Sequence, residues 1–166
     1  MTKTSTRHVY ALALGSNRPL SARLAPARLL KEAVRLIAQS GTVLAVAPVI
    51  KTPPLGPSRR IFANSAVLVE SALPPETMLL QLQAIEHGLG RQRFMHWGAR
   101  RLDIDVILWS GGRWNSRSLH IPHRAFRERD FVLTPLCAIA PDWRDPVSGL
   151  SIRHLRFRSR KAISGG

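Results

Sequence analysis

Apolar residues recur along the chain in runs with two different spacings. Short runs rich in Val and Ile predict strands, and stretches with apolar residues three and four positions apart predict helices. Glycine or proline follows most of these segments and marks their ends. We therefore expect strands at residues 9–14, 42–51 and 61–69, and helices at residues 22–39 and 74–89.

The clearest predicted strand covers residues 102–109, because apolar residues occupy every second position from Leu102 to Leu108. Gly111 and Gly112 predict a turn into a short return strand that reaches Ile121. Two short helical stretches are expected afterwards, at residues 124–128 and 132–139.

The predicted element order is β-α-β-β-α-β with a C-terminal addition. This order is typical of an α+β domain of the ferredoxin-like, or split βαβ, kind, in which helices pack on a mainly antiparallel sheet. We expect a single domain over residues 1–166. Residues 1–8 and 157–166 are expected to be flexible, because the N-terminus is polar and the tail is basic.

The composition indicates a globular protein, since 45% of the 166 residues are hydrophobic. No apolar run approaches the roughly 18 residues that span a bilayer. We therefore expect a cytoplasmic protein, without membrane contact and monomeric. The single cysteine, Cys137, lies among apolar residues and is expected to be a buried, inert thiol.

The net charge is +15, from 25 Lys and Arg against 10 Asp and Glu. A charge of this size attracts polyanions, and nucleic acids, triphosphates and pyrophosphates all fit it. Arginine-rich coding bias on a solvated surface explains the excess equally well. The scarce acidic residues are more informative, because two of them stand together at Asp103 and Asp105.

Asp103 and Asp105 lie two positions apart on a predicted strand, so their side chains point to the same face, about 6 to 7 Å apart. Neighbouring carboxylates repel one another and are costly to bury without compensation. Magnesium takes one or two carboxylates together with substrate phosphates. A solvent-facing pair is the alternative, but the strand is otherwise apolar and arginines surround it, so we favour a metal site.

Four arginines precede this pair within a dozen residues: Arg91, Arg93, Arg100 and Arg101. The planar guanidinium binds phosphate oxygens through paired hydrogen bonds. Phosphoryl transfer depends mainly on positioning and charge neutralisation, which an arginine-rich loop beside a magnesium site provides. Ion pairing with the aspartates is the alternative for one or two of these residues, with Arg101 the first candidate.

His123 follows Pro122, which restricts the backbone just before it. A histidine held in this way donates to phosphate or transfers protons, although a structural role is the more common one. We identify neither an H-x-x-H motif nor a cluster of cysteines and histidines, so zinc is not expected. The chain also lacks the phosphate-loop, dinucleotide-binding and nucleophile-elbow motifs, so a different architecture must hold any ATP.

A stiff loop at residues 52–57 contains three prolines and cannot be regular structure. Its rigid backbone offers fixed polar groups to a flat heterocycle, and Asn64 can pair with an amide edge. Phe62 and Phe131 can stack on the two faces of such a ring. The alternative is that both phenylalanines belong to the core.

In their order and spacing, these segments resemble the 6-hydroxymethyl-7,8-dihydropterin pyrophosphokinase family. The similarity runs from residue 13 to about residue 155. Its most specific pieces are Thr52-Pro53-Pro54-Leu55-Gly56, Arg100-Arg101-Leu102-Asp103-Ile104-Asp105, Ile121-Pro122-His123 and Arg129-Asp130-Phe131-Val132-Leu133. The resemblance implies a ferredoxin-like fold and a folate-biosynthesis enzyme. Such an enzyme uses two magnesium ions to transfer the β,γ-pyrophosphate of ATP to the pterin hydroxymethyl oxygen, leaving AMP.

The resemblance also implies roles for particular residues. The metal ions are expected on Asp103 and Asp105. The catalytic set is completed by Arg91, Arg100 and His123. ATP is expected to contact Gln83, Glu86, Arg93, His123 and Arg129. The pterin pocket is expected to be lined by Thr52, Pro53, Leu55, Phe62, Asn64, Trp97 and Phe131.

The sequence departs from the family pattern at several positions. Ser118 stands where some members have a nucleotide-contacting arginine, and Arg124 follows His123 where proline or tyrosine is usual. Phe62 replaces a common tyrosine. We expect these changes to affect nucleotide affinity and loop motion more than the reaction.

Two other functions fit parts of the sequence. A basic nucleic-acid-binding domain is compatible with the topology and the charge. However, the chain lacks the interleaved aromatic residues of an RNA-binding strand, so nucleic acid is not expected as a partner. The third possibility is a family member that acts on another pterin alcohol or only binds.

Overall fold

The computed structural model describes residues 6–17, 25–53, 61–90 and 102–164. Its strands are β1 (His8–Ser16), β2 (Thr42–Val46), β3 (Ile50–Thr52), β4 (Phe62–Ser71), β5 (Asp103–Trp109), β6 (Trp114–Asn115) and β7 (His120–Ile121). Its helices are α1 (Pro26–Ile37), α2 (Pro75–Gly88), the 3₁₀ turn η1 (Phe126–Glu128), α3 (Asp130–Ile139) and α4 (Ile152–Ser164). None of the described helices is long and apolar enough to cross a membrane.

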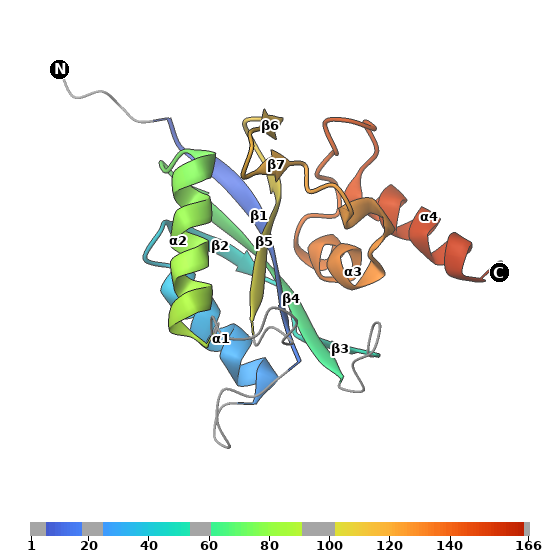
Figure 1. The fold of residues 1–166 in the computed structure, drawn as a ribbon. Coiled ribbons are helices and arrows are strands. Elements are labelled where there is room, and N and C mark those ends of the chain that lie inside the picture. Colours follow the sequence, from blue (N-terminus) through green and yellow to red (C-terminus); the bar gives the residue numbers. More distant parts are fainter. Residues whose placement is uncertain (1–5, 18–24, 54–60, 91–101, 165–166) are drawn as a thin grey trace.

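The main sheet is antiparallel and runs in the order β2-β4-β1-β5, with β3 also paired to β4. Strand β4 thus lies between β2 and β1, which is the arrangement of the split βαβ motif. Helices α1 and α2 cover one face of the sheet, and α3 and α4 lie on the other (Figure 1). The predicted ferredoxin-like α+β fold is confirmed.

Each face of the sheet has its own hydrophobic core. Alternate residues of β1, such as Leu12 and Leu14, are buried in the first core with α1 and α2. The residues between them, Ala11 and Ala13, belong to the second core with α3 and α4. Large side chains of β1 therefore lie under α1 and α2, and small ones lie under α3. Cys137 of α3 is partly rather than fully buried against the second core.

A β-bulge interrupts β5. Val106 pairs with Leu12 and Leu108 pairs with Ala11, so Ile107 is an extra residue. Val106 faces the first core, but Leu108 faces the second. The predicted alternation is therefore wrong at Leu108, because the extra residue reverses the side-chain direction. The two aspartates precede the bulge and are not affected by it.

The predicted strand at residues 42–51 is two strands, β2 and β3, which pair with β4 one after the other. Pro48 lies between them and has no N–H to donate to a ladder. The neighbouring Ala47 stays bonded to β4. Its N–H donates to the Ala66 carbonyl at 2.8 Å, and its carbonyl accepts from Ser65 Oγ at 2.8 Å. The prediction of one continuous strand is therefore wrong.

The predicted return strand is a small hairpin of β6 and β7, separate from the main sheet. Glu76, in the first turn of α2, accepts hydrogen bonds from Trp114 Nε1 at 3.3 Å, from Ser118 Oγ at 2.7 Å and from Ser116 Oγ. These bonds hold the hairpin against the start of α2. Ser118, one of the departures from the family pattern, therefore hydrogen-bonds to Glu76.

The C-terminal tail is helical as far as residue 164. Ile152 and Leu155 of α4 are buried in the second core, and Arg156 Nε donates to Thr134 Oγ1 of α3 at 3.1 Å. Apolar burial at helical spacing therefore stabilises this basic segment. At the other end of the chain, His8 is the first residue of β1.

Candidate active site

A cavity of about 580 Å³ opens where the ends of β1, β4 and β5 meet η1 and α3. This volume is within the usual range for small-molecule sites. The cavity brings together seven residues that the sequence assigned to the site: Thr52, Phe62, Asn64, Asp103, Asp105, Arg129 and Phe131. These residues come from four separate segments of the chain, so the fold assembles them.

Gly15 lies in the cavity wall between the two sides of the site. It pairs with Asn64 of β4 on one side and with Asp103 of β5 on the other. A Cβ atom on Gly15 would lie 3.1 Å from Asn64 Oδ1. Glycine therefore leaves room for the amide of Asn64 and keeps this part of the wall free of a side chain.

Asp103 and Asp105 both line the cavity, which confirms that they share a face of β5. The side chain of Asp105 is 45% exposed, so its carboxylate is accessible. Over the ranges that the structure describes, no group of three His, Cys, Asp or Glu residues is placed to hold a metal. Two carboxylates in an open cavity fit Mg²⁺, which completes its shell with water and phosphate oxygens, and do not make a closed zinc site.

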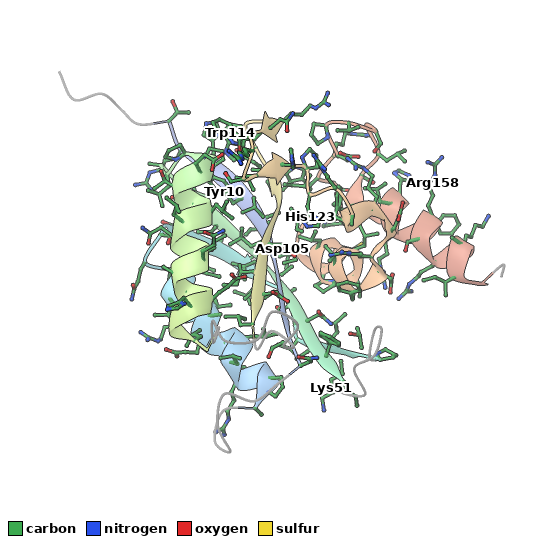
Figure 2. The ribbon with its side chains drawn as sticks, in the orientation of Figure 1. Tyr10, Lys51, Asp105, Trp114, His123 and Arg158 are labelled. Atoms are coloured by element: carbon green, nitrogen blue, oxygen red, sulfur yellow. The ribbon has the colours of Figure 1, made fainter. Side chains whose placement is uncertain are left out.

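His123 lies beside Asp105 between β5 and α3 (Figure 2). Its backbone N–H donates to the Ile107 carbonyl at 3.0 Å. Its ring Nδ1 accepts from the backbone N–H of Ala125 at 3.3 Å. A neutral ring that accepts at Nδ1 carries its proton on Nε2, which lies 4.0 Å from Asp105 Oδ2. Burial lowers the pKa of His123, and Asp105 opposes this while Arg129 adds to it. The ring is therefore a neutral donor at pH 7.

Arg129 brings a positive charge to the cavity wall. It is the residue just before α3, and its Cζ lies 5.8 Å from the centroid of the Phe131 ring. A guanidinium in this place suits phosphate oxygens. Sequence reasoning did not identify the neighbouring Glu128, which also lines the cavity, because an acidic residue in a basic stretch has no distinctive pattern. The other lining residues not predicted are Ala13, Leu14, Gly15, Ala125 and Val132.

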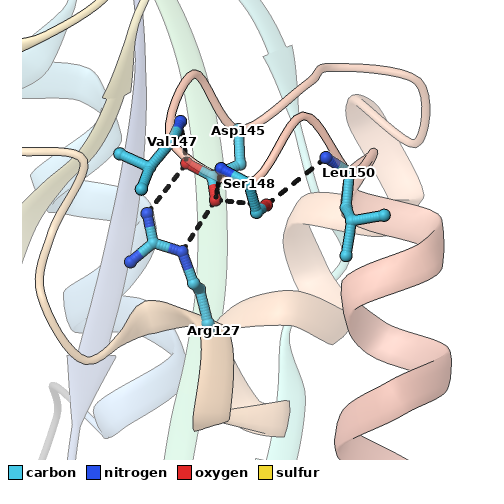
Figure 3. A network of polar contacts seen from close by, with 5 residues as sticks. All are labelled: Arg127, Asp145, Val147, Ser148 and Leu150. Atoms are coloured by element: carbon cyan, nitrogen blue, oxygen red, sulfur yellow. Dashed lines mark hydrogen bonds and ion pairs between the residues drawn. The ribbon is translucent and has the colours of Figure 1, made fainter.

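An ion pair between the partly buried Arg127 and the fully buried Asp145 joins η1 to the loop before α4 (Figure 3). Arg127 donates through Nε and Nη2 to the two oxygens of Asp145 at 2.7 and 2.8 Å. The N–H groups of Val147 and Ser148 donate to the same carboxylate at 3.1 Å each, and Ser148 Oγ donates at 2.6 Å. Burial raises the pKa of Asp145, but these hydrogen bonds outweigh it and hold the pKa far below its usual range. The ionised carboxylate therefore anchors the turn that leads to Arg129.

One end of the cavity, called here the amide end, contains the side chain of Asn64, and a hydrogen bond fixes its orientation. Asn64 is 4% exposed, and its Nδ2 donates to Thr52 Oγ1 at 2.7 Å. Phe62 and Phe131 line the same cavity, although Phe131 also packs against the second core. The result is an amide held in a fixed orientation next to aromatic rings, as a pocket for a flat heterocycle requires.

Other predicted site residues lie elsewhere. Pro53 is exposed and Gln83 lies on the exposed side of α2. Glu86 is buried, and its Oε1 accepts a hydrogen bond from the N–H of Ile104 at 2.7 Å. The remaining predictions concern residues outside the described ranges: Leu55, Arg91, Arg93, Trp97, Arg100 and Arg101.

Arg124, which departs from the family pattern, contacts a second histidine. Its Nη2 lies 2.7 Å from Nε2 of His120 and donates to it. His120 and His123 have the H-x-x-H spacing, so the expectation that the chain lacks this motif is wrong. The Nε2 atom of His120 is therefore occupied by a hydrogen bond from Arg124, whereas Nε2 of His123 lies near Asp105.

The fold and the cavity define a class. It is a ferredoxin-like α+β protein in which one cavity contains a pair of carboxylates and a buried amide side chain, that of Asn64. The family model described as 7,8-dihydro-6-hydroxymethylpterin-pyrophosphokinase (HPPK) matches residues 11–141. This match covers most of the chain, so the chain belongs to the HPPK family. The resemblance identified from the sequence is confirmed.

Individual relatives agree with this family. A 2-amino-4-hydroxy-6-hydroxymethyldihydropteridine pyrophosphokinase of Synechocystis sp. is 42% identical over 100 residues, which are 60% of this chain and 51% of that protein. A protein of the same name from Haemophilus influenzae is 36% identical over 134 residues, 79% of this chain and 81% of that protein. The match therefore spans about half the length of the first relative and most of the second.

Solved structures show the same fold at much lower identity. A crystal structure of a Plasmodium falciparum HPPK-DHPS triple mutant has a TM-score of 0.77 and 14% identity. The similarity covers 98% of this chain and 46% of that chain. At this identity the likeness concerns the fold alone.

Proposed function

We propose that this chain transfers the β,γ-pyrophosphoryl group of ATP to the hydroxymethyl oxygen of 6-hydroxymethyl-7,8-dihydropterin, in folate biosynthesis. The hydroxyl oxygen bonds to the β-phosphorus, and the bond from that phosphorus to the oxygen it shares with the α-phosphorus breaks. The hydroxyl proton is released, and the products are AMP and the pterin diphosphate. Family membership supports this reaction. The observation that supports the reaction best is that one cavity contains both the carboxylate pair, Asp103 and Asp105, and the amide of Asn64.

The acceptor pterin occupies the amide end of the cavity. A pterin ring is flat and has an amide-like edge, which the side chain of Asn64 can pair with. The hydrogen bond to Thr52 holds this amide in one orientation before the ligand arrives. Phe62 and Phe131 offer aromatic surfaces for stacking, which favours a flat ligand over a flexible one.

The phosphates occupy the opposite end, at Asp103 and Asp105. These carboxylates would hold Mg²⁺, two ions by the family resemblance, together with oxygens of ATP. When bound, Mg²⁺ neutralises phosphate charge and helps to align the reacting groups. The two carboxylates fix the place where the nucleotide enters and keep it facing the pterin.

Two further groups act on the phosphates. The neutral ring of His123 presents its Nε2–H on the side of Asp105. From there Nε2–H would donate a hydrogen bond to a phosphate oxygen, and the ring would keep its proton. Arg129 neutralises negative charge from the α3 side of the cavity. From the family resemblance we assign further ATP contacts to Gln83, Arg91, Arg93 and Arg100, and further pterin contacts to Pro53, Leu55 and Trp97.

The direct test is to incubate the chain with ATP, Mg²⁺ and the hydroxymethyl dihydropterin and to measure AMP. We expect AMP and pterin diphosphate in equal amounts. Asp103→Asn and Asp105→Asn should each lower kcat by at least about a hundredfold, because metal-ion charge stabilisation supplies several kcal/mol. Asp142→Asn is the charge-matched control, since that side chain is 83% exposed and pairs with Arg153. No AMP from the parent chain, or equal loss in the control, contradicts the proposal.

A further inference from the structure

Glu86 connects helix α2 to the outer edge of β5. Its Oε1 accepts from the N–H of Ile104 at 2.7 Å, and Glu86 is only 7% exposed. Within the described part of the main sheet, β5 pairs with β1 alone. The carboxylate of Glu86 therefore stands where the carbonyl of a neighbouring strand would otherwise accept this hydrogen bond.

This contact falls between the two aspartates of the cavity. In an antiparallel strand, successive N–H groups point to opposite edges. Because the N–H of Ile104 points outward to Glu86, those of Asp103 and Asp105 point toward β1. The backbone that carries both carboxylates is thus held from the sheet side by β1 and from the outer side by α2.

We infer that Glu86 is a positioning residue. Through the N–H of Ile104, it fixes the direction in which Asp103 and Asp105 present their carboxylates to a divalent cation. This role rests on the proposed function and takes the place of the direct ATP contact implied by the family resemblance. Partners of this kind behind metal ligands set ligand orientation, and losing one typically weakens metal binding 10- to 100-fold.

Three substitutions of Glu86 separate the hydrogen bond from charge and packing. Glu86→Gln removes the charge but keeps an acceptor oxygen at the same reach. Glu86→Asp keeps the charge but withdraws the acceptor from Ile104 by one methylene. Glu86→Leu removes the acceptor and fills a similar volume. Gln81→Leu, on the exposed side of the same helix, is the matched control for a leucine in α2.

The first readout is binding of Mn²⁺, which prefers oxygen ligands, followed by electron paramagnetic resonance on the protein without substrate. The second is hydrogen exchange of the Ile104 amide, followed by NMR. We expect Glu86→Asp and Glu86→Leu to weaken Mn²⁺ binding about tenfold or more, with Glu86→Gln and Gln81→Leu within about twofold of the parent chain. Exchange at Ile104 should accelerate in the same two variants.

Two results would overturn the inference. One is unchanged Mn²⁺ binding in folded Glu86→Asp and Glu86→Leu proteins. The other is a loss in Glu86→Gln as large as that in Glu86→Leu, because the charge would then matter and the hydrogen bond would not. If Glu86→Leu fails to fold, the comparison of Glu86→Asp with Glu86→Gln decides alone.

These measurements also separate the role of Glu86 from the reaction. They need no turnover, so a parent chain that forms no AMP removes the proposed function and leaves the effect on Mn²⁺ measurable. A parent chain that forms AMP, with Mn²⁺ binding insensitive to Glu86→Asp, removes only the positioning role.

Discussion

Asn64 and Asp103 stand level with each other on opposite sides of β1, because both residues pair with Gly15. Neighbouring strands are about 4.8 Å apart, so the backbones of the two residues are separated by about 10 Å. Backbone hydrogen bonds of the sheet therefore set the distance between the amide end and the carboxylate end of the cavity. Loop conformation does not enter into this distance.

Gly15→Ala should weaken pterin binding while leaving cation binding intact. The added Cβ would lie 3.1 Å from Asn64 Oδ1, so the amide must shift against its hydrogen bond to Thr52. We expect the Kd for the pterin to rise about tenfold, or 1.4 kcal/mol, in a calorimetric titration. Gly88→Ala is the control, because a Cβ at Gly88 meets no atom within 4 Å. Equal effects of the two substitutions would argue against this account.

The ring of His123 should titrate below pH 6.5 in metal-free protein, as followed by NMR of the ring protons. Burial lowers its pKa, Asp105 opposes this and Arg129 adds to it. Asp105→Asn should therefore lower the pKa further, and Arg129→Gln should raise it. Because the folded pKa lies below the unfolded value, the unfolded chain takes up the proton first. His123 thus reduces stability as pH falls through about 6.5, and a higher pKa in Asp105→Asn would contradict the assignment.

Asp145→Asn should destabilise the fold by about 3 kcal/mol or more at pH 7, because it removes the charge that compensates a partly buried arginine. Hydrogen bonds from Arg127, Ser148 and the backbone hold the pKa of Asp145 far below its usual range. Its stabilising effect is therefore complete above the unfolded pKa, about 3.9, and is lost as pH falls below that value. Urea unfolding at pH 7 and pH 3 measures this, and a difference between parent and variant that does not shrink at pH 3 would count against it.

Leu155→Ala should destabilise the protein by about 2 to 5 kcal/mol, the usual cost of a cavity in a core. Leu155 is 5% exposed and belongs to the second core, together with residues of α3. Ile163→Ala, at a residue of α4 that is 69% exposed, should change stability by less than about 0.5 kcal/mol. Chemical denaturation separates the two cases, and similar small effects would mean that α4 is not part of the fold.

The spacing of apolar residues predicted the face of β5 that carries the two aspartates, but not the irregularities in the strands. Alternation with a period of two predicts that Asp103 and Asp105 share a face, because only the strand between them matters. The same pattern failed at Leu108, because the bulge residue Ile107 is as apolar as its neighbours. Pro48 is a readable signal for the break between β2 and β3, but the prediction treated the apolar run as continuous.

Contacts between distant segments could not be derived from spacing. Arg127 and Asp145 are 18 residues apart, and neither lies in a periodic pattern that points to the other. Glu86 is equally far from Ile104, and its burial depends on how α2 crosses the edge of the sheet. Tertiary packing, which a single sequence does not encode in any short pattern, decides both contacts.

The two outer edges of the main sheet differ in how they resist association. Exposed strand edges invite pairing with other molecules, and charges placed along an edge discourage it. A strand that approached β5 at Ile104 would meet the carboxylate of Glu86. It would find the N–H of Ile104 already hydrogen-bonded to that carboxylate. At the opposite edge, β2 exposes Leu44 and Val46. Aggregation through this sheet would therefore begin at β2, and the edge beside the two aspartates is protected from it.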